Sequence, residues 1–575
     1  MAEFNEIRTP DMHDPVDGDG RPPGFRAAML ALVGGLGALA VPYIAAEVAG
    51  PDTKLAEFRV WTPEDLPPFA NHFKMSGVGA QPVPAGATAS SGSIVDDGAE
   101  PPAPAIVTPV ITLAPPAPSA PAPGVPAGPA QPAAPASPYA RIAIPPAAFE
   151  GLTVGIEDPS GALGPFWRRL ADVALKTPGA KVRLAQWGDS AIAADGMPSA
   201  ARRLLQRTFG DGGHGFSLIA ASNPWYRRKD IDWTSSGWTA DEFIRDSADD
   251  RRYGYGGVVA SGGPGAKGSW KTVVAEDGAP APEVGLTASS FEVFFQATKR
   301  GNTFDLLVDG AVAKTVEATA DPAEDRSVTV EVPDGPHTFA VKVTGGRARL
   351  YGVAVERSEG VVYDGLGVVG ARDTRWLNAD EAAHLAALRQ RKPDLYILMY
   401  GGNALEDQTS MDWYREHLTQ VVARWRKALP DQSCLIMTPI DHGERHRGRV
   451  RTVPRQVELM AVQREVAKAQ GCAFFSLYDA MGGDGAIGRW FETGLASGDL
   501  AHPTAKGSVE LGRLFYMALM QGLHGWIEAE KKAPTPAPAA PAPTDAAPAP
   551  TPPPAASPTQ PAAPATPPPA PGATP

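Results

Sequence analysis

The sequence has 575 residues, and its 61 glycines and 61 prolines are a high share for a globular chain, without the period of collagen. The formal net charge is −12, and no stripe rich in lysine or arginine occurs. A nucleic-acid-binding protein needs such a stripe to neutralise phosphates, so DNA and RNA are excluded as expected partners.

Residues 27–46 form a run without a charge that is long enough to cross the hydrocarbon core of a membrane, which is roughly 30 Å thick. We therefore expect a membrane anchor here, preceded by a tail over residues 1–26. A cleavable signal peptide is the alternative, but the tail is longer and more acidic than the short basic region of such a peptide. Basic residues flank the run on both sides, so they do not fix its orientation.

Two proline-rich segments flank the middle of the chain. Fourteen prolines fall within residues 101–140, and eighteen follow Lys532. Segments 77–138 and 533–575 are rich in proline and alanine and cannot bury enough apolar surface to fold. We expect both to be disordered, the first as a linker that holds the next domain away from a membrane.

The body between these segments changes pattern in its middle. Apolar runs alternate with helical periodicity over 139–231 and 357–526, which predicts a parallel sheet covered by helices. The expected strands are 182–187, 395–400, 434–440 and 473–478, and the expected helices are 198–209, 411–427, 456–470 and 505–523. Residues 232–356 are instead rich in short strands and glycine turns, which predicts an all-β sandwich inserted into an α/β domain. Its expected strands are 291–295, 304–308, 328–332, 338–343 and 350–355.

The two cysteines lie in the second α/β part. Cys434 and Cys472 are too few for a disulfide framework and lack the paired spacing of a zinc site. Each precedes or begins an apolar run, so we expect buried thiols. A single bridge between neighbouring strands is the alternative.

A candidate nucleophile follows the first expected strand. Gly188-Asp189-Ser190 stands where a parallel strand turns into a helix, the edge at which open α/β sheets bind ligands. A serine needs a base, and Asp499 with His502, three residues later, offers an imidazole and a carboxylate to orient it. Taken singly, each motif also has a structural interpretation as a turn.

Two further turns could supply an oxyanion hole. The Asn403 side chain follows the strand 395–400 in Tyr-Gly-Gly-Asn, where its amide can donate to a developing negative charge. A backbone N–H in the glycine turn 367–371 could add a second donor.

In chain order these four elements resemble the four blocks of the SGNH (GDSL-type) hydrolase superfamily, which carry Ser, Gly, Asn and His. Stretches such as 209–213 and 363–368 are similar to the branch of peptidoglycan O-acetylesterases, in which a carbohydrate-binding-like β-sandwich interrupts the catalytic domain. The resemblance covers 139–526 and implies a three-layer α/β domain, split into 139–231 and 357–526, with a jelly-roll-like insert over 232–356.

The resemblance also implies roles. Ser190 would be the nucleophile, His502 the general base and Asp499 its orienting partner. The oxyanion hole would consist of the backbone N–H groups of Ser190 and Gly370 and the side chain of Asn403. No metal and no cofactor are expected.

Other motif positions are structural or depart from the pattern. Gly188 and Asp189 would shape the turn that presents the nucleophile. Relatives in this branch often have histidine after that serine and asparagine before the second-block glycine, where this chain has Ala191 and Val369. Neither position is obligatory for the mechanism, but both bear on the substrate.

Three other groups of residues could bind a metal or the substrate. The His-x-x-x-His in 441–446 is a metal site, a substrate contact or a solvated loop, and it lacks the order of a metalloprotease motif. His214 is expected in a loop near the site. Five aromatic residues of the insert are expected to pack in its core rather than stack on sugars: Trp270, Phe291, Phe294, Phe295 and Tyr351.

The sequence thus predicts a serine esterase of the cell envelope that removes O-acyl groups, first of all O-acetyl groups, from a polysaccharide such as peptidoglycan. It would be anchored in the inner membrane and face the periplasm or exterior, or be secreted if the N-terminal segment is cleaved. The alternatives are a polysaccharide O-acetyltransferase with the same residues and a non-catalytic glycan-binding envelope protein.

Overall fold

The computed structural model describes residues 111–114, 137–272 and 284–532. The predicted anchor at 27–46, nearly all of the linker and the C-terminal tail lie outside these ranges. Within the described ranges, no helix combines the length and the apolar character needed to cross a membrane.

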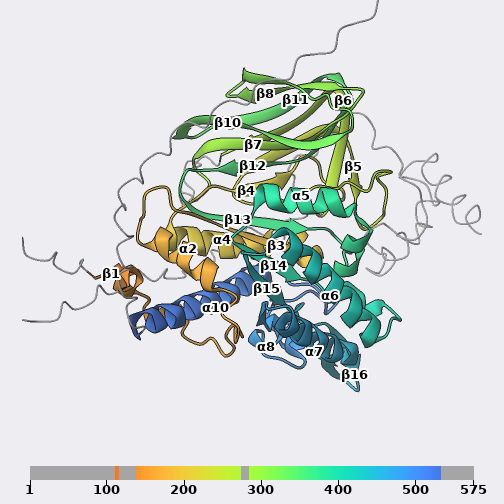
Figure 1. The fold of residues 1–575 in the computed structure, drawn as a ribbon. Coiled ribbons are helices and arrows are strands. Elements are labelled where there is room, and N and C mark those ends of the chain that lie inside the picture. The colour runs from red at the N-terminus through yellow and green to blue at the C-terminus, as the bar shows by residue number, and fades with distance from the viewer. Residues whose placement is uncertain (1–110, 115–136, 273–283, 533–575) are drawn as a thin grey trace, which may run out of the picture. The chain divides into compact units, whose positions relative to one another are not determined.

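A five-stranded parallel sheet forms the centre of the α/β part (Figure 1). Its order is β13-β3-β14-β15-β18, and every neighbouring pair is parallel. The strands are β3 (Lys181–Gly188), β13 (Gly360–Gly367), β14 (Leu395–Met399), β15 (Ser433–Met437) and β18 (Ala473–Phe475). Because all five run the same way, the loops that follow them meet at one edge, where the candidate motifs lie.

Helices cover both faces of this sheet because alternate strand residues point to opposite sides. Leu395, Ile397 and Met399 share one apolar core with α2, α4 and α10, whereas Tyr396 and Leu398 share another with α5, α6 and α7. The helices are α2 (Gly164–Ala174), α4 (Gly196–Phe209), α5 (Glu381–Arg391), α6 (Met411–Ala428), α7 (Pro454–Ala469) and α10 (Ala505–Lys532). Shorter helices, α3 (Ser190–Ala193), α8 (Leu477–Ala480) and α9 (Ala486–Glu492), lie in the connections.

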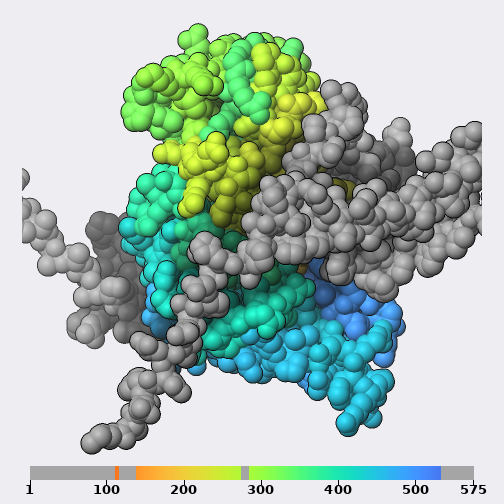
Figure 2. Space-filling view, turned by 90° about the vertical axis from the view of Figure 1, so that its right-hand side faces the viewer, coloured from red at the N-terminus to blue at the C-terminus, as the bar shows by residue number. Residues whose placement is uncertain are grey.

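The middle of the chain forms a second, nine-stranded sheet in which every pairing is antiparallel. Its strands are β4 (Gly215–Leu218), β5 (Asp232–Glu242), β6 (Val258–Lys271), β7 (Ala288–Ala297), β8 (Asn302–Val308), β9 (Ala311–Glu317), β10 (Glu324–Gly335), β11 (Thr338–Gly346) and β12 (Ala348–Glu356). Strand β4, which follows α4, pairs with β12. These residues are coloured from yellow to green in the space-filling view (Figure 2). The predicted mixture of a parallel sheet with helices and a large antiparallel β region is confirmed.

Most expected elements are present, with errors at their ends. The apolar run 473–478 is a strand only to Phe475, because Ser476 caps helix α8 by accepting a hydrogen bond from the Asp479 N–H. The last helix runs to Lys532, nine residues beyond the expected end. Strands β4, β5, β6 and β9 were not expected; β6 holds five glycines and alanines among its first nine residues, a composition that does not suggest a strand.

The expectation of free thiols is wrong. Cys434 and Cys472 form a disulfide, with Cα atoms 4.7 Å apart. The reason is the register of the parallel pair, which places Leu435 opposite Ala473 and therefore sets the residues just before them side by side. The bridge ties β15 to the start of β18.

Candidate active site

The Ser190 turn is tightly packed between two neighbouring strand ends. A Cβ atom on Gly188 would lie 2.9 Å from the carbonyl oxygen of Met399 and 2.5 Å from Cγ1 of Ile192, so only glycine fits. Asp189 is buried and caps helix α3 by accepting a hydrogen bond from the Ala191 N–H at 3.1 Å. The turn thus fixes Ser190 at the first position of α3, on the carboxyl edge of β3.

Three of the predicted residues, Ser190, His502 and Asp499, are linked by hydrogen bonds into one row. Oγ of Ser190 lies 2.9 Å from Nε2 of His502, and Nδ1 of His502 lies 2.8 Å from Oδ2 of Asp499. The other carboxylate oxygen of Asp499 accepts from the backbone N–H groups of Ala501 and His502. These bonds favour the tautomer in which Nδ1 carries the proton and Nε2 accepts from the serine hydroxyl.

The pKa values of His502 and Asp499 are both shifted in the direction that favours proton transfer to His502. The hydrogen bond to Asp499 raises the pKa of His502 above its usual value, against partial burial, which lowers it. Burial alone would raise the pKa of Asp499, but the hydrogen bonds from the His502 ring and the Ala501 N–H outweigh it and lower the pKa to about 2. The carboxylate is therefore ionised at neutral pH, and it stabilises a positive charge on His502.

The Asn403 side chain lies between the turns that follow β3 and β13. Its Nδ2 donates to Oδ2 of Asp189 at 3.1 Å and to the carbonyl oxygen of Ala371 at 3.2 Å. Gly370 directly precedes Ala371 and has φ +81°, a left-handed conformation that favours glycine. The structure thus brings the neighbourhoods of all three predicted oxyanion donors, at residues 190, 370 and 403, to one place.

His442 is a second histidine at this edge. A Cβ atom on Gly402 would lie 2.8 Å from its Cε1 and 2.9 Å from its Nε2, so the ring covers the glycine that precedes Asn403. Its Nδ1 lies 3.0 Å from the Ile440 carbonyl oxygen, and burial lowers its pKa, which keeps the ring neutral at pH 7. The neighbouring Asp189 carboxyl has its pKa raised by burial, although His442 and His502 counteract this.

The two histidines of the His-x-x-x-His motif separate in the structure. His446 is exposed at the end of strand β16 (Gly443–His446), in a hairpin with β17 (Arg449–Thr452), whereas His442 lies at the site. Among the described residues, no three His, Cys, Asp or Glu side chains are grouped as metal ligands. Sequence reasoning could not single out His442, because only the fold places it over Gly402.

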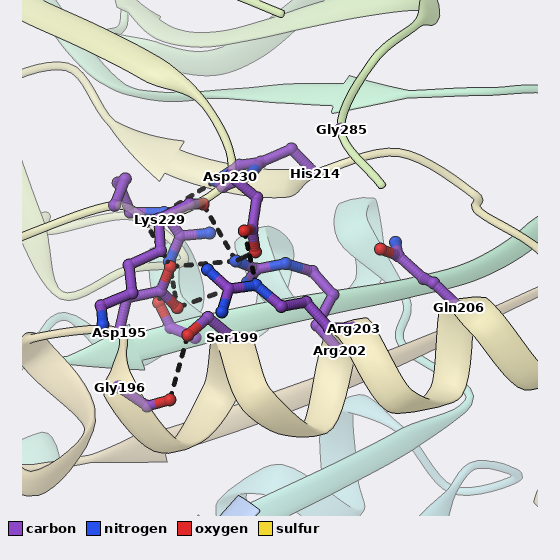
Figure 3. Close-up of polar contacts among 12 residues, drawn as sticks. Asp195, Gly196, Ser199, Arg202, Arg203, Gln206, His214, Lys229, Asp230 and Gly285 are labelled. Atoms are coloured by element: carbon purple, nitrogen blue, oxygen red, sulfur yellow. Dashed lines mark hydrogen bonds and ion pairs between the residues drawn. The ribbon is translucent and has the colours of Figure 1, made fainter. Parts of the chain in front are cut away.

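A buried ion cluster lies behind the nucleophile turn (Figure 3). Asp195 and Arg202 are both fully buried and form two hydrogen bonds, and Arg202 also donates to Asp230 at 2.8 Å. Arg202 and Arg228 hold the pKa of Asp195 below its usual value, although burial alone would raise it. The cluster joins α4 to the segment that leads into β5.

His214 lies in the loop between α4 and β4, as expected, and its side chain is buried in this cluster. Its Nε2 accepts a hydrogen bond from Nε of Arg228, and burial lowers the pKa of the ring well below its usual value. Its side chain is therefore a neutral, buried part of the support for helix α4.

The chain matches the sequence model of the GDSL-like lipase/acylhydrolase family over residues 327–508. This stretch includes Gly370, Asn403, Asp499 and His502, and it begins after Ser190. The structure is similar to a solved structure of a peptidoglycan O-acetylesterase, at 23% sequence identity and a TM-score of 0.54, with 65% of this chain and 99% of the other covered. Residues 327–508 therefore form part of a GDSL-like lipase/acylhydrolase domain.

Further comparisons are weaker. A family two carbohydrate esterase from Cellvibrio japonicus is 12% identical with a TM-score of 0.23, covering 54% of this chain and 99% of the other. No curated protein sequence matches this acylhydrolase. At 23% identity the structure of the peptidoglycan O-acetylesterase shows a shared fold, and the family match shows that the enzyme is an esterase.

The inserted sheet of this esterase buries the aromatic residues that were candidates for sugar stacking. Each is at most 4% exposed: Trp270, Phe291, Phe294, Phe295 and Tyr351. They pack in the apolar core, as expected, and offer no exposed platform.

Proposed function

We propose that this esterase removes O-acetyl groups from a cell-envelope polysaccharide, peptidoglycan first, through a covalent acyl-enzyme on Ser190. The observation that carries the proposal is the row Ser190–His502–Asp499, with its 2.9 Å and 2.8 Å hydrogen bonds. The likeness to a peptidoglycan O-acetylesterase supports the choice of substrate.

The first half of the reaction forms the acyl-enzyme. Oγ of Ser190 attacks the ester carbonyl carbon while Nε2 of His502 takes its proton, and Asp499 stabilises the imidazolium. The N–H groups of Ser190 and Gly370 would donate to the oxyanion. The amide of Asn403 would join them by exchanging its hydrogen bond to the Ala371 carbonyl for one to the oxyanion. His502 then returns the proton to the sugar oxygen as the ester bond breaks.

The second half releases the acid. His502 removes a proton from water, the hydroxide attacks the acetyl carbon of the acyl-enzyme, and the proton passes to Oγ of Ser190 as acetate leaves. His502 and Asp499 are 44% and 51% exposed, so water reaches the base without rearrangement. If a sugar hydroxyl entered instead of water, the same residues would transfer the acetyl group.

The disulfide supports a location outside the cytoplasm. Structural disulfides persist in oxidising compartments such as the periplasm and are rare in the cytosol. Together with the uncharged run at 27–46, the Cys434–Cys472 bridge favours an envelope protein held at the inner membrane and facing outward.

A fluorophosphonate probe tests the nucleophile. The purified full chain should gain one probe adduct, and peptide mapping by mass spectrometry should place it on Ser190. The Ser190→Ala protein should gain none, and wild-type protein that acquires no adduct although it is folded would favour a glycan-binding protein without catalysis. A second assay separates hydrolysis from transfer. An unacetylated glycan is added as acceptor, and the amounts of free acetate and of newly acetylated acceptor are measured.

A further inference from the structure

A groove lined mostly by polar side chains lies at the segments that follow Ala371 and the Asn403 turn. It has a volume of about 910 Å³ and is lined by residues of the 3-10 helix η7 (Asp373–Asn378), the segment 407–409 and the first turns of α6. Arg372, on its wall, follows the residue whose carbonyl oxygen accepts from Asn403. Asp407, which also lines the groove, pairs with Arg372 at 2.8 Å and ends the turn that begins at Asn403.

One wall of the groove carries an exposed aromatic face. Trp413 is 37% exposed, although large apolar side chains elsewhere in the described body are mostly buried. Its ring stacks on His417 one helical turn later, with centroids 3.8 Å apart and planes at 23°. The Trp413 N–H donates to Oγ of Ser410, which caps α6, and the stacking on His417 holds the ring, so its other face offers a preformed flat surface to a ligand.

Arg375 also lines the groove, as an exposed cation. Arg375 is exposed and its side chain makes no hydrogen bond or ion pair with any residue in 111–114, 137–272 or 284–532, whereas Arg372 is neutralised by Asp407. An unpaired guanidinium in a chain of net charge −12 is suited to a carboxylate, which it can hold with two hydrogen bonds.

We propose that this groove is a subsite for an anionic glycan, in which a sugar ring lies on Trp413 and a carboxylate of the glycan or of an attached peptide binds Arg375. The proposal rests on the proposed function, because the groove would bind the part of the polysaccharide next to the acetylated sugar. The groove thereby gives the esterase a preference for acetylated glycans that carry carboxylates over neutral acetylated glycans.

Binding to the full chain tests the subsite without turnover. A soluble peptidoglycan fragment, a disaccharide with its peptide, is titrated by calorimetry into Ser190→Ala protein and into the same protein with Trp413→Ala or Arg375→Gln. We expect each second substitution to weaken binding roughly tenfold, since each removes one ring contact or one charge-assisted contact. Trp413→Phe should recover most of the affinity, and Arg300→Gln, an exposed arginine in the turn between β7 and β8, should not change it.

Turnover provides the second arm. The kcat/KM for O-acetylated peptidoglycan fragments, divided by that for acetylated xylan, should fall roughly tenfold in Arg375→Gln, because xylan backbone sugars carry no carboxylate. Unchanged binding and an unchanged ratio in both groove variants would overturn the subsite while leaving the esterase proposal intact. The two proposals can also fail separately. If the groove variants lose binding but the wild-type enzyme releases no acetate from peptidoglycan, the subsite is upheld and the proposed substrate of the esterase is overturned.

Discussion

Nε2 of His502 lies 2.9 Å from Oγ of Ser190, although 312 residues separate them along the chain. The parallel sheet explains this proximity, because Ser190 follows β3, and His502 precedes α10, which packs against α4. Helix α4 in turn packs against β13, the neighbour of β3 in the sheet. The antiparallel sheet lies between Ser190 and His502 in sequence, yet both residues lie at the carboxyl edge of the parallel sheet.

The pairing of His502 with Asp499 predicts the pH dependence of the enzyme. Catalysis needs neutral His502, so kcat/KM should rise with pH through its pKa, which Asp499 raises. In Asp499→Asn the carboxylate that raises the pKa of His502 is lost, so the acidic limb of the pH profile of kcat/KM should move to lower pH. The kcat should also fall by about three to four orders of magnitude. The measurement is kcat/KM for an aryl acetate from pH 4 to pH 9.

Asp309 provides the control for this experiment. It pairs with His337 at the same 2.8 Å, but in the antiparallel sheet. Asp309→Asn should leave both kcat and the position of the acidic limb unchanged. An Asp499→Asn enzyme with the wild-type profile would contradict the role of the carboxylate.

Asn403 is expected to act on the transition state. Replacing it with alanine removes the amide that bridges Asp189 and the Ala371 carbonyl, and kcat should fall about 10²- to 10³-fold with little change in KM. Asn403→Asp places a second carboxyl beside buried Asp189 and should be at least as harmful. Steady-state kinetics on an aryl acetate measure both; a rise in KM alone would show that the amide only binds substrate.

Gly402 and His442 should be energetically coupled. A methyl group on Gly402 would meet the His442 ring at 2.8 Å, while its backbone, at φ −53°, is compatible with alanine. Gly402→Ala should therefore lower kcat by displacing the ring or the Asn403 turn. His442→Ala in the same chain should restore part of that loss, and a double-mutant cycle measures the coupling. Strictly additive effects would show that the two residues do not meet.

The Cys434–Cys472 bridge should stabilise the α/β part. It closes a loop across 38 residues, which corresponds to about 4 kcal/mol of unfolding free energy in the chain-entropy description. The Cys434→Ala/Cys472→Ala protein should unfold at lower denaturant concentration, followed by circular dichroism. Dithiothreitol should destabilise wild-type protein and leave the double variant unaffected; equal stability of the two proteins without reductant would contradict the prediction.

The sequence predicted the residues at the site better than their surroundings. Ser190, Asn403, Asp499 and His502 stand in motifs at strand or helix ends, so local pattern and family resemblance sufficed to find them. His442 and the groove beside Arg372 depend on which loops meet at the sheet edge, and no local pattern contains that information. The roles of the motif residues stay predictions until they are measured.

The errors of the sequence interpretation have the same origin. The disulfide follows from the order of β15 and β18 in the sheet, which the spacing of Cys434 and Cys472 does not reveal. The loop position of His214 was predicted, but its burial depends on a tertiary contact with Arg228 that no local pattern contains. The anchor at 27–46 remains a prediction.

Acetate release from O-acetylated peptidoglycan by the purified full chain tests the central claim most directly, with Ser190→Ala and His502→Ala beside the wild type and folding checked by circular dichroism. We predict that the wild type releases acetate and that each substitution lowers the rate by about three orders of magnitude or more, because the residues act as one unit. Release that persists in Ser190→Ala at the wild-type rate, or no release by folded wild type, would contradict the account.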